Sequence, residues 1–147
     1  MRRTALYFAF IVSVLGVGLA IGSITRPDGW YAALAKPSFN PPNWIFAPVW
    51  TLLYVMIAVA GARSFERSDG MQLWLSQMVL NFAWTPVFFG LHRPGAALVI
   101  VLATLAAVVA FIVTRWKADR FSALLFIPYA AWVAFASVLN ASIVVLN

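Results

Sequence analysis

The chain of 147 residues contains no cysteine, one histidine and only four acidic residues. Without cysteine it has no disulfide framework, no thiolate nucleophile and no sulfur-ligated metal site. The single histidine, His92, stands beside Arg93 at an expected helix end, where a capping or interface role is more typical than metal binding. The sequence also lacks a Ser/His/Asp set and a glycine-rich phosphate loop. It therefore predicts no metal site and no ordinary hydrolytic or phosphate chemistry.

Charge is scarce as well. Charged residues make up 10% of the chain and hydrophobic residues 64%, with a mean hydropathy of +0.93. Soluble domains do not have such a composition. The net charge of +6 comes from basic residues scattered between apolar runs rather than gathered on one face, so no nucleic-acid partner is expected. The length leaves room for a single domain, 1–147.

Charged residues divide the chain into five uncharged windows, at 4–25, 37–62, 70–92, 94–114 and 121–147. Each window reaches the ~20 residues that an α-helix needs to cross the hydrocarbon core of a bilayer. The sequence therefore predicts an all-α membrane protein, a five-transmembrane-helix bundle with helices near 5–25, 44–62, 71–91, 95–114 and 121–145. The first window is too long for the apolar region of a signal peptide, so it is expected to remain as a span.

Basic residues are unevenly divided between the two sides of this bundle. One side carries Arg2, Arg3, Arg63, Arg67, Arg115, Lys117 and Arg120, and the other carries only Arg26, Lys36 and Arg93. The asymmetry predicts a multi-pass protein of a bacterial inner membrane with its N-terminus in the cytoplasm. No charged residue lies inside a predicted span, which argues against proton-coupled pumps and ion transporters.

Aromatic and amide side chains form stripes on three predicted helices. At about 100° per residue, one face of 71–91 carries Trp74, Gln77, Asn81, Trp84 and Phe88, one face of 121–145 carries Tyr129, Trp132, Ala136, Asn140 and Ile143, and helix 44–62 repeats Phe46, Trp50 and Tyr54. Buried amides and indole N–H groups need partners in hydrocarbon, so the stripes should face the interior. They fit either ordinary packing between helices or a site for a large, flat, mostly apolar ligand.

Prolines interrupt the same three helices, at Pro48, Pro86 and Pro128. The last two are expected to kink their helices, either to admit a ligand or as tolerated packing features. Helix 5–25 carries Gly18-x-x-x-Gly22, which allows close contact between helices. Helices 5–25 and 95–114 are therefore expected to serve as scaffold or as the surface of a homodimer.

The connection 26–43 is long and rich in proline and aromatic residues. It fits an aromatic belt at the membrane surface, a lid over the mouth of the bundle, or both. Its candidate residues are Trp30, Lys36, Phe39, Asn40, Pro41 and Pro42.

Three blocks of the sequence resemble the TspO/MBR family of tryptophan-rich sensory proteins and translocator proteins, which includes the peripheral-type benzodiazepine receptor. They are KPSFNPPNWIFAPVWTLLY at 36–54, LNFAWTPVFFG at 80–90, and PYAAW at 128–132 with Leu139-Asn140. The resemblance covers nearly the whole chain in order. It implies a five-helix bundle that binds tetrapyrroles such as protoporphyrin IX and haem, sterols, and synthetic isoquinoline and benzodiazepine ligands, with no cofactor required.

By motif position, the resemblance assigns ligand contacts to Trp50, Tyr54, Asn81, Trp84, Trp132 and Ala136, under a lid formed by Trp30, Asn40, Pro41 and Pro42. With the stripes, the full candidate set is Phe46, Trp50, Tyr54, Asn81, Trp84, Phe88, Tyr129, Trp132, Ala136 and Asn140. Arg26 or Lys36 would pair with the propionates of a tetrapyrrole. Cholesterol-binding relatives carry a Leu-x-Tyr-x-Arg-type motif late in the last helix, and residues 139–147 have neither the Tyr nor the Arg.

Three functions remain open from the sequence. The first is a receptor or sensor that regulates or moves porphyrin intermediates. The second is an enzyme that degrades porphyrin in light through Trp50 and Trp132, since acid–base machinery is missing. The third is a facilitated transporter of porphyrin or sterol. The resemblance also admits an outer-membrane location.

Overall fold

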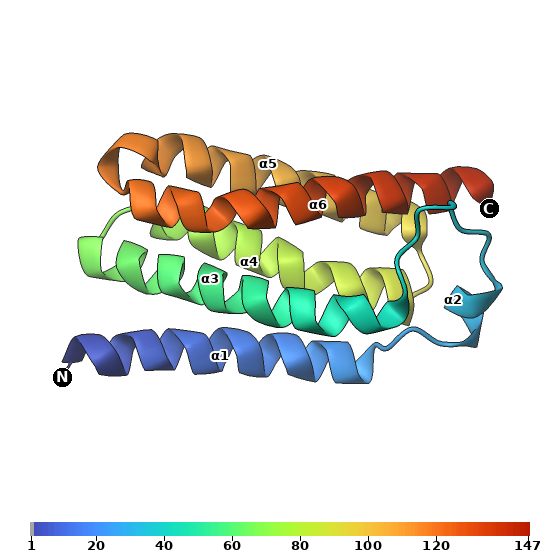
Figure 1. Ribbon diagram of the computed structural model, residues 1–147, viewed down its shortest axis with the longest axis horizontal. Coiled ribbons are helices and arrows are strands. Elements are labelled where there is room, and N and C mark those ends of the chain that lie inside the picture. The colour runs from blue at the N-terminus through green and yellow to red at the C-terminus, as the bar shows by residue number, and fades with distance from the viewer. Residues whose placement is uncertain (1) are drawn as a thin grey trace.

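The computed structural model describes residues 2–147, and helices are the only regular elements in that range. In chain order they are α1 (Arg2–Ile24), α2 (Gly29–Ala33), η1 (Asn43–Ile45), α3 (Phe46–Arg67), α4 (Met71–Thr85), η2 (Pro86–Gly90), α5 (Pro94–Ala118) and α6 (Arg120–Leu146). The long helices lie side by side as antiparallel rods, with α2 at one end (Figure 1). The all-α class predicted from the sequence is confirmed.

Four helical stretches in residues 2–147 are long and apolar enough to cross a membrane: Arg2–Ile24, Asn43–Arg67, Pro94–Ala118 and Arg120–Leu146. Many of their large apolar side chains face outward, including Val99 and Val113 of α5, each 68% exposed. Such surfaces are stable in lipid rather than in water. The chain is therefore an integral, multi-pass membrane protein.

The predicted helix 71–91 is divided in the structure. The α-helical pattern of α4 stops after 15 residues at Thr85, and η2 continues as a π-helical turn. Pro86 has no N–H to donate to the preceding turn. The N–H of Leu91 donates to the Pro86 carbonyl, five residues earlier, at 2.8 Å, which is the bonding pattern of a π-helix. The expected distortion at Pro86 thus takes the form of a π turn. At Pro128, by contrast, α6 stays continuous.

The other helices differ from their predicted bounds mainly at charged ends. Helix α1 already begins at Arg2, α3 continues to Arg67, and α5 continues to Ala118. The last turns of α3 and α5 carry basic residues, which interact favourably with the negative end of the helix dipole. The charge-free windows marked the apolar part of each helix, and the helices extend past it.

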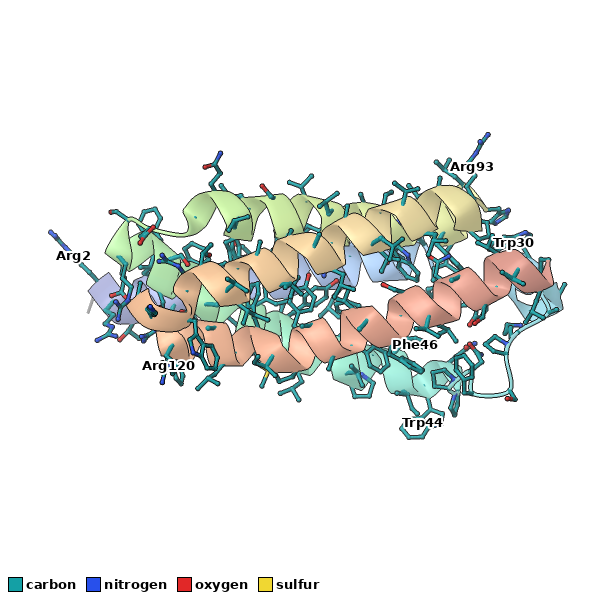
Figure 2. The ribbon with its side chains drawn as sticks, turned by 90° about the horizontal axis from the view of Figure 1, so that it is seen from above. Arg2, Trp30, Trp44, Phe46, Arg93 and Arg120 are labelled. Atoms are coloured by element: carbon teal, nitrogen blue, oxygen red, sulfur yellow. The ribbon has the colours of Figure 1, made fainter. Side chains whose placement is uncertain are left out.

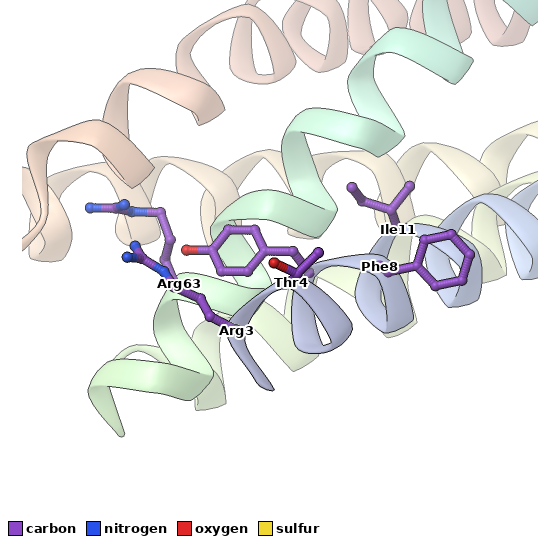
Figure 3. A pocket seen from close by; sticks show the side chains of 6 residues that line it. Arg3, Thr4, Phe8, Ile11 and Arg63 are labelled. Atoms are coloured by element: carbon purple, nitrogen blue, oxygen red, sulfur yellow. The ribbon is translucent and has the colours of Figure 1, made fainter. Parts of the chain in front are cut away.

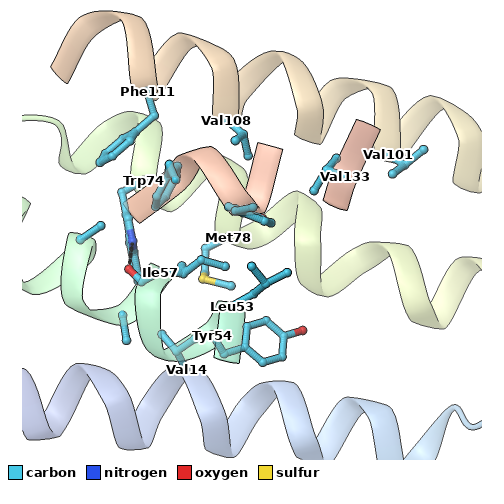
Figure 4. Packing of buried hydrophobic residues seen from close by; sticks show 14 residues of the cluster. Val14, Leu53, Tyr54, Ile57, Trp74, Met78, Val101, Val108, Phe111 and Val133 are labelled. Atoms are coloured by element: carbon cyan, nitrogen blue, oxygen red, sulfur yellow. Dashed lines mark hydrogen bonds between the residues drawn. The ribbon is translucent and has the colours of Figure 1, made fainter. Parts of the chain in front are cut away.

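The apolar core lies between α3, α4, α5 and α6 (Figure 4). Its fully buried members include Ile57 from α3, Val108 and Phe111 from α5, and Phe126 from α6. Helix α1 is peripheral, and only Val14 and Gly18 of it are buried. A peripheral α1 is compatible with both expected roles, scaffold and homodimer surface.

Ion pairs join the helices at the end of the bundle that holds the N-terminus. The Asp119 carboxylate, with 2% of its side chain exposed, accepts a hydrogen bond from Nη2 of Arg63 at 2.7 Å. It also caps α6 by accepting from the Ser122 N–H. Burial alone would raise the pKa of Asp119, but hydrogen bonds from Arg63 and Ser122 outweigh it and hold the pKa below its ordinary value. The charged carboxylate therefore links α3 to the turn between α5 and α6.

Helix α1 approaches α3 closely at Gly18. A Cβ atom at this position would overlap the ring of Tyr54, whereas a Cβ atom at Gly22 would meet nothing within 4 Å. Of the predicted Gly18-x-x-x-Gly22 pair, only Gly18 therefore allows a close contact between helices of this protein. Gly22 lies on the outer face.

The two glycines give a matched test of this contact. Gly18→Ala should destabilise the protein by about 1–3 kcal/mol, because the added methyl group forces α1 or Tyr54 to move. Gly22→Ala should cost nothing, because alanine is the better helix former and has open space there. Thermal denaturation in detergent, followed by circular dichroism, measures both. Equal midpoints for the two variants would contradict the packing of α1 described above.

Candidate ligand-binding site

A chain of hydrogen bonds joins α3, α4 and α6 in the interior of the bundle. The Tyr54 hydroxyl donates to Oδ1 of Asn81 at 3.2 Å, and Nδ2 of Asn81 donates to the Tyr129 hydroxyl at 2.6 Å. The Tyr129 hydroxyl in turn donates to Oε1 of Gln77 at 2.7 Å. All four side chains are buried, so the predicted inward direction of the stripes is confirmed here.

This series of hydrogen bonds ends on backbone carbonyl groups of α3 and α4. Nε2 of Gln77 donates to the Trp74 carbonyl at 2.7 Å, and the Trp74 indole donates to the Ile57 carbonyl at 2.8 Å. Since a buried polar group without a partner is costly in hydrocarbon, this closed set of bonds stabilises the three helices against one another. These side chains therefore satisfy one another across the interior.

Trp50 connects this interior to the surface of the bundle. Its ring centroid lies 5.3 Å from that of Tyr54 and 6.3 Å from that of Tyr129, in the tilted and edge-on geometries that aromatic pairs prefer. The side chain itself is half-buried. Trp50 is therefore the aromatic residue of the interior cluster that reaches the outer face.

A second cluster lies toward the α2 end. The Trp84 indole donates to Oδ1 of Asn140 at 2.9 Å, and Nδ2 of Asn140 donates to the Pro94 carbonyl at 2.9 Å. Trp84 also stacks on Phe88, with centroids 5.0 Å apart. The predicted stripes of 71–91 and 121–145 thus meet directly here, and Phe88 remains buried although it belongs to the π turn.

The short helix α2 covers this second cluster. Trp30 and Tyr31 both lie edge-on to Phe88, at 5.8 and 6.2 Å. Trp30 also stacks on His92 at 4.3 Å, and Nε2 of His92 lies 3.3 Å from Oδ2 of Asp28. A hydrogen bond from the Tyr31 backbone N–H, with a smaller contribution from His92, holds the pKa of Asp28 below its ordinary value. Figure 2 places Trp30 at the opposite end of the bundle from Arg2 and Arg120.

The rest of the 26–43 connection is tied to α2 and to the C-terminus. Lys36 donates to the carbonyls of Ala32 and Leu34, at 3.3 and 3.1 Å, and Asn40 accepts from the Tyr31 hydroxyl at 3.3 Å. Asn147 exchanges hydrogen bonds with both backbone groups of Ala35. The remaining predicted lid residues follow in the chain, with Pro41 accepting from Asn40 and Pro42 preceding η1. Just after the connection, Trp44 of η1 is 72% exposed, as expected of a residue in an aromatic belt.

A groove opens to the outside between α3 and α6. It has a volume of about 400 Å³ and is lined by Val49, Leu52, Leu53, Pro128, Ala131 and Trp132. Around it the rings follow one another: Trp132 lies 5.9 Å from Phe46 and 5.5 Å from Phe135, and Phe135 lies 6.2 Å from Phe39 of the long connection. Ala136 is half-buried one turn beyond Trp132. The groove is almost entirely apolar and open to lipid.

The predicted ligand-binding residues thus fall in three neighbouring places instead of around one pocket. The interior holds Trp50, Tyr54, Asn81 and Tyr129, and the α2 end holds Trp84, Phe88 and Asn140 beneath Trp30. Trp132 lines the groove, and Phe46, Ala136 and Phe39 lie near it. Gln77 was recognised in the stripe but not as a site residue, although it completes the interior chain. Tyr31 and Phe135 also pack in these clusters, but neither belongs to a stripe, so helical periodicity could not identify them.

Together the fold and this site define an all-helical membrane protein whose interior is built from aromatic and amide side chains. The chain belongs to the TspO/MBR family, whose model matches residues 9–146. It is 37% identical to protein CrtK of Rhodobacter capsulatus, covering 97% of this chain and 92% of that one. It is 40% identical to the tryptophan-rich protein TspO of Archaeoglobus fulgidus, covering 95% of each. The human translocator protein is 37% identical, over 76% of this chain and 70% of that one.

Removing the Tyr129 hydroxyl tests the interior chain. Tyr129→Phe should destabilise the protein by about 1–2 kcal/mol, because Asn81 loses an acceptor and Gln77 loses a donor where water cannot replace them. Tyr7→Phe is the matched control, since that hydroxyl donates to Glu66 at an exposed position. It should cost no more than a few tenths of a kcal/mol. Thermal denaturation in detergent compares the two, and an equal loss in both variants would show that the interior bonds contribute nothing special.

Proposed function

We propose that this TspO/MBR-family protein binds a tetrapyrrole, such as protoporphyrin IX or haem, in the groove between α3 and α6, and that it senses porphyrin intermediates or passes them on. The observation that carries the proposal is the position of Trp132. It lines an open, apolar groove that faces lipid, and the rings of Phe46 and Phe135 surround it. A flat, apolar macrocycle dissolved in the bilayer would find a large stacking surface there.

The size of the groove fits partial enclosure of such a ligand. Its volume of about 400 Å³ lies in the lower part of the range for small-molecule sites. One face of the macrocycle would lie on Trp132 and the α3 side chains, and the other face would stay in contact with lipid or with the long connection through Phe39. The bonded interior behind Trp50 would act as the rigid wall of the site.

The propionates of the ligand would lie toward the membrane surface at the α2 end. The basic residues at that end are Arg26, Lys36 and Arg93. Arg26 is exposed, whereas the Lys36 amine already bonds to two backbone carbonyls. Arg26 is therefore the better partner of the two cations that the sequence suggested.

The relatives' names favour a sensing or moving role over an enzymatic one. One relative is a tryptophan-rich sensory protein and others are translocator proteins. The apolar α3–α6 groove offers binding surface without general acids or bases. We therefore propose ligand binding, with transfer or signalling as its consequence.

We also propose that the bundle crosses the membrane five times. Helix α4 and η2 together run from Met71 to Gly90, and they connect the end of α3 at one face of the bundle to the start of α5 at the other (Figure 1). If α3 and α5 both span, this segment must cross as well. The concentration of basic residues at the N-terminal end then favours an inner membrane with that end in the cytoplasm.

Tryptophan substitutions in the groove and behind it test the site. Trp132→Phe and Trp50→Phe should each raise the Kd for protoporphyrin IX about five-fold, because each loses roughly 1 kcal/mol of stacking and buried surface. Trp116→Phe should leave the Kd unchanged, because Trp116 is exposed at the opposite end and pairs with Arg120. Titrations followed by the Soret absorbance in the dark measure all three without relying on tryptophan fluorescence.

A blocking variant separates the groove from any other site. Ala131 is exposed in the groove, so Ala131→Trp should fill it without disturbing the core and should abolish saturable binding. Full binding by this variant, or an equal weakening in all three tryptophan variants, would refute the groove as the tetrapyrrole site.

A further inference from the structure

A second groove lies at the other end of the bundle, between α1 and α3 (Figure 3). It has a volume of about 520 Å³ and is lined by Arg3, Thr4, Tyr7, Phe8, Ile11 and Arg63. None of these residues belongs to the aromatic site described above. The groove lies on the outer face of the bundle, along the first half of α1, which has no buried residue.

The lining of this groove is divided along the helix axis. In Figure 3 the guanidinium groups of Arg3 and Arg63 lie together at the end of the bundle, near Thr4, while Phe8 and Ile11 lie further along α1 toward its middle. Phe8 is 68% exposed and so has no packing partner that shields it. The groove therefore has a cationic head and an apolar tail.

The guanidinium groups of Arg3 and Arg63 keep N–H groups that are not bonded to a carboxylate and could bind an anion. Arg3, with 70% of its side chain exposed, contacts Glu66 through Nε at 3.3 Å. Arg63 uses Nε and Nη2 on Asp119. Within residues 2–147, these contacts leave both terminal nitrogens of Arg3 and Nη1 of Arg63 without a carboxylate.

The acidic residues nearby are already neutralised by their own partners. Glu66 accepts from the Tyr7 hydroxyl at 2.8 Å and pairs with Arg3, and Asp119 is held by Arg63 and Arg67. Arg3, Arg63 and Arg67 thus face the two carboxylates of Glu66 and Asp119, while Asp69 pairs with Arg115. Arg2 and Arg120 add further positive charge at the same end of the bundle (Figure 2).

We propose that this groove binds an anionic membrane lipid, with the phosphate of its headgroup against Arg3 and Arg63 and an acyl chain along Phe8 and Ile11. Basic side chains at a membrane surface attract anionic headgroups, and the apolar part of the groove lies where the acyl chain of such a lipid must lie. The lipid fills the space between α1 and α3 next to the half of α1 that has no buried residue. It thereby fastens α1 to the bundle.

Native mass spectrometry of the purified protein in a neutral detergent tests this proposal. The probes are phosphatidylglycerol, phosphatidylcholine and inorganic phosphate. Phosphatidylglycerol should bind saturably and at least five-fold more tightly than phosphatidylcholine, because only the anionic headgroup leaves a net charge for the arginines to neutralise. Inorganic phosphate should not bind at the same concentrations, because it lacks the acyl chain that contacts Phe8 and Ile11.

Three variants locate the binding. Arg3→Gln should weaken phosphatidylglycerol binding about five-fold, the effect of one basic residue at a membrane surface. Thr4→Phe should weaken it as well by filling the exposed middle of the groove. Arg93→Gln removes the same charge at the opposite end and should leave binding unchanged. The folded state of each variant is checked by thermal denaturation, and Arg3→Gln is expected to fold because its only ion pair is exposed.

Three results would overturn the proposal. Equal retention of phosphatidylglycerol and phosphatidylcholine would remove the role of charge. An equal effect of Arg3→Gln and Arg93→Gln would show that the lipid responds to overall charge and not to this groove. Tight binding of inorganic phosphate alone would assign the arginines to a free anion in place of a lipid.

Discussion

The need to satisfy polar groups inside hydrocarbon is the constraint on which this structure depends. Asn81 and Tyr129 have no access to water, and they solve the problem by bonding to each other and to Tyr54 and Gln77. Because each partner comes from a different turn of α3, α4 or α6, the bonds hold these helices in one register. Helix α1 takes no part in these hydrogen bonds. It packs against Tyr54 of α3 at Gly18, where the absence of a side chain allows the close approach.

The same constraint determines where a ligand is expected. An interior that is closed by its own hydrogen bonds offers no free polar group. We therefore expect the binding surface at the edge of the network, where Trp50 is half-buried and Trp132 lines the lipid-facing groove. The two ends of the bundle then have different chemistry. The α2 end is rich in aromatic residues, and Trp30 and Asn147 hold the connection there by ring packing and hydrogen bonds. The other end is basic, and ion pairs to Asp119 join its helices.

Features that depend on helix length and helix periodicity could be predicted from the sequence. Four of the five charge-free windows match the long helices. Most stripe residues of α4 and α6 face inward as the 3.6-residue period requires, and Trp84 meets Asn140 across 56 positions. Features that depend on three-dimensional proximity could not be predicted. Periodicity does not reveal that Tyr129 would bond to Gln77 in place of a ligand, or that Asn147 would hold Ala35 across 112 positions. The π turn at Pro86 was expected only as a kink, because proline removes a donor without specifying how the chain repairs the loss.

Paramagnetic NMR with Mn(III) protoporphyrin IX tests the central claim most directly, because the metal broadens signals according to their distance from the bound macrocycle. Binding in the groove predicts the strongest broadening at Leu52, Ala131 and Trp132, and little effect at Ala97 and Val101, which are buried on α5. The strongest broadening on α5, or broadening spread evenly over the lipid-facing surface, would contradict the placement of the tetrapyrrole between α3 and α6.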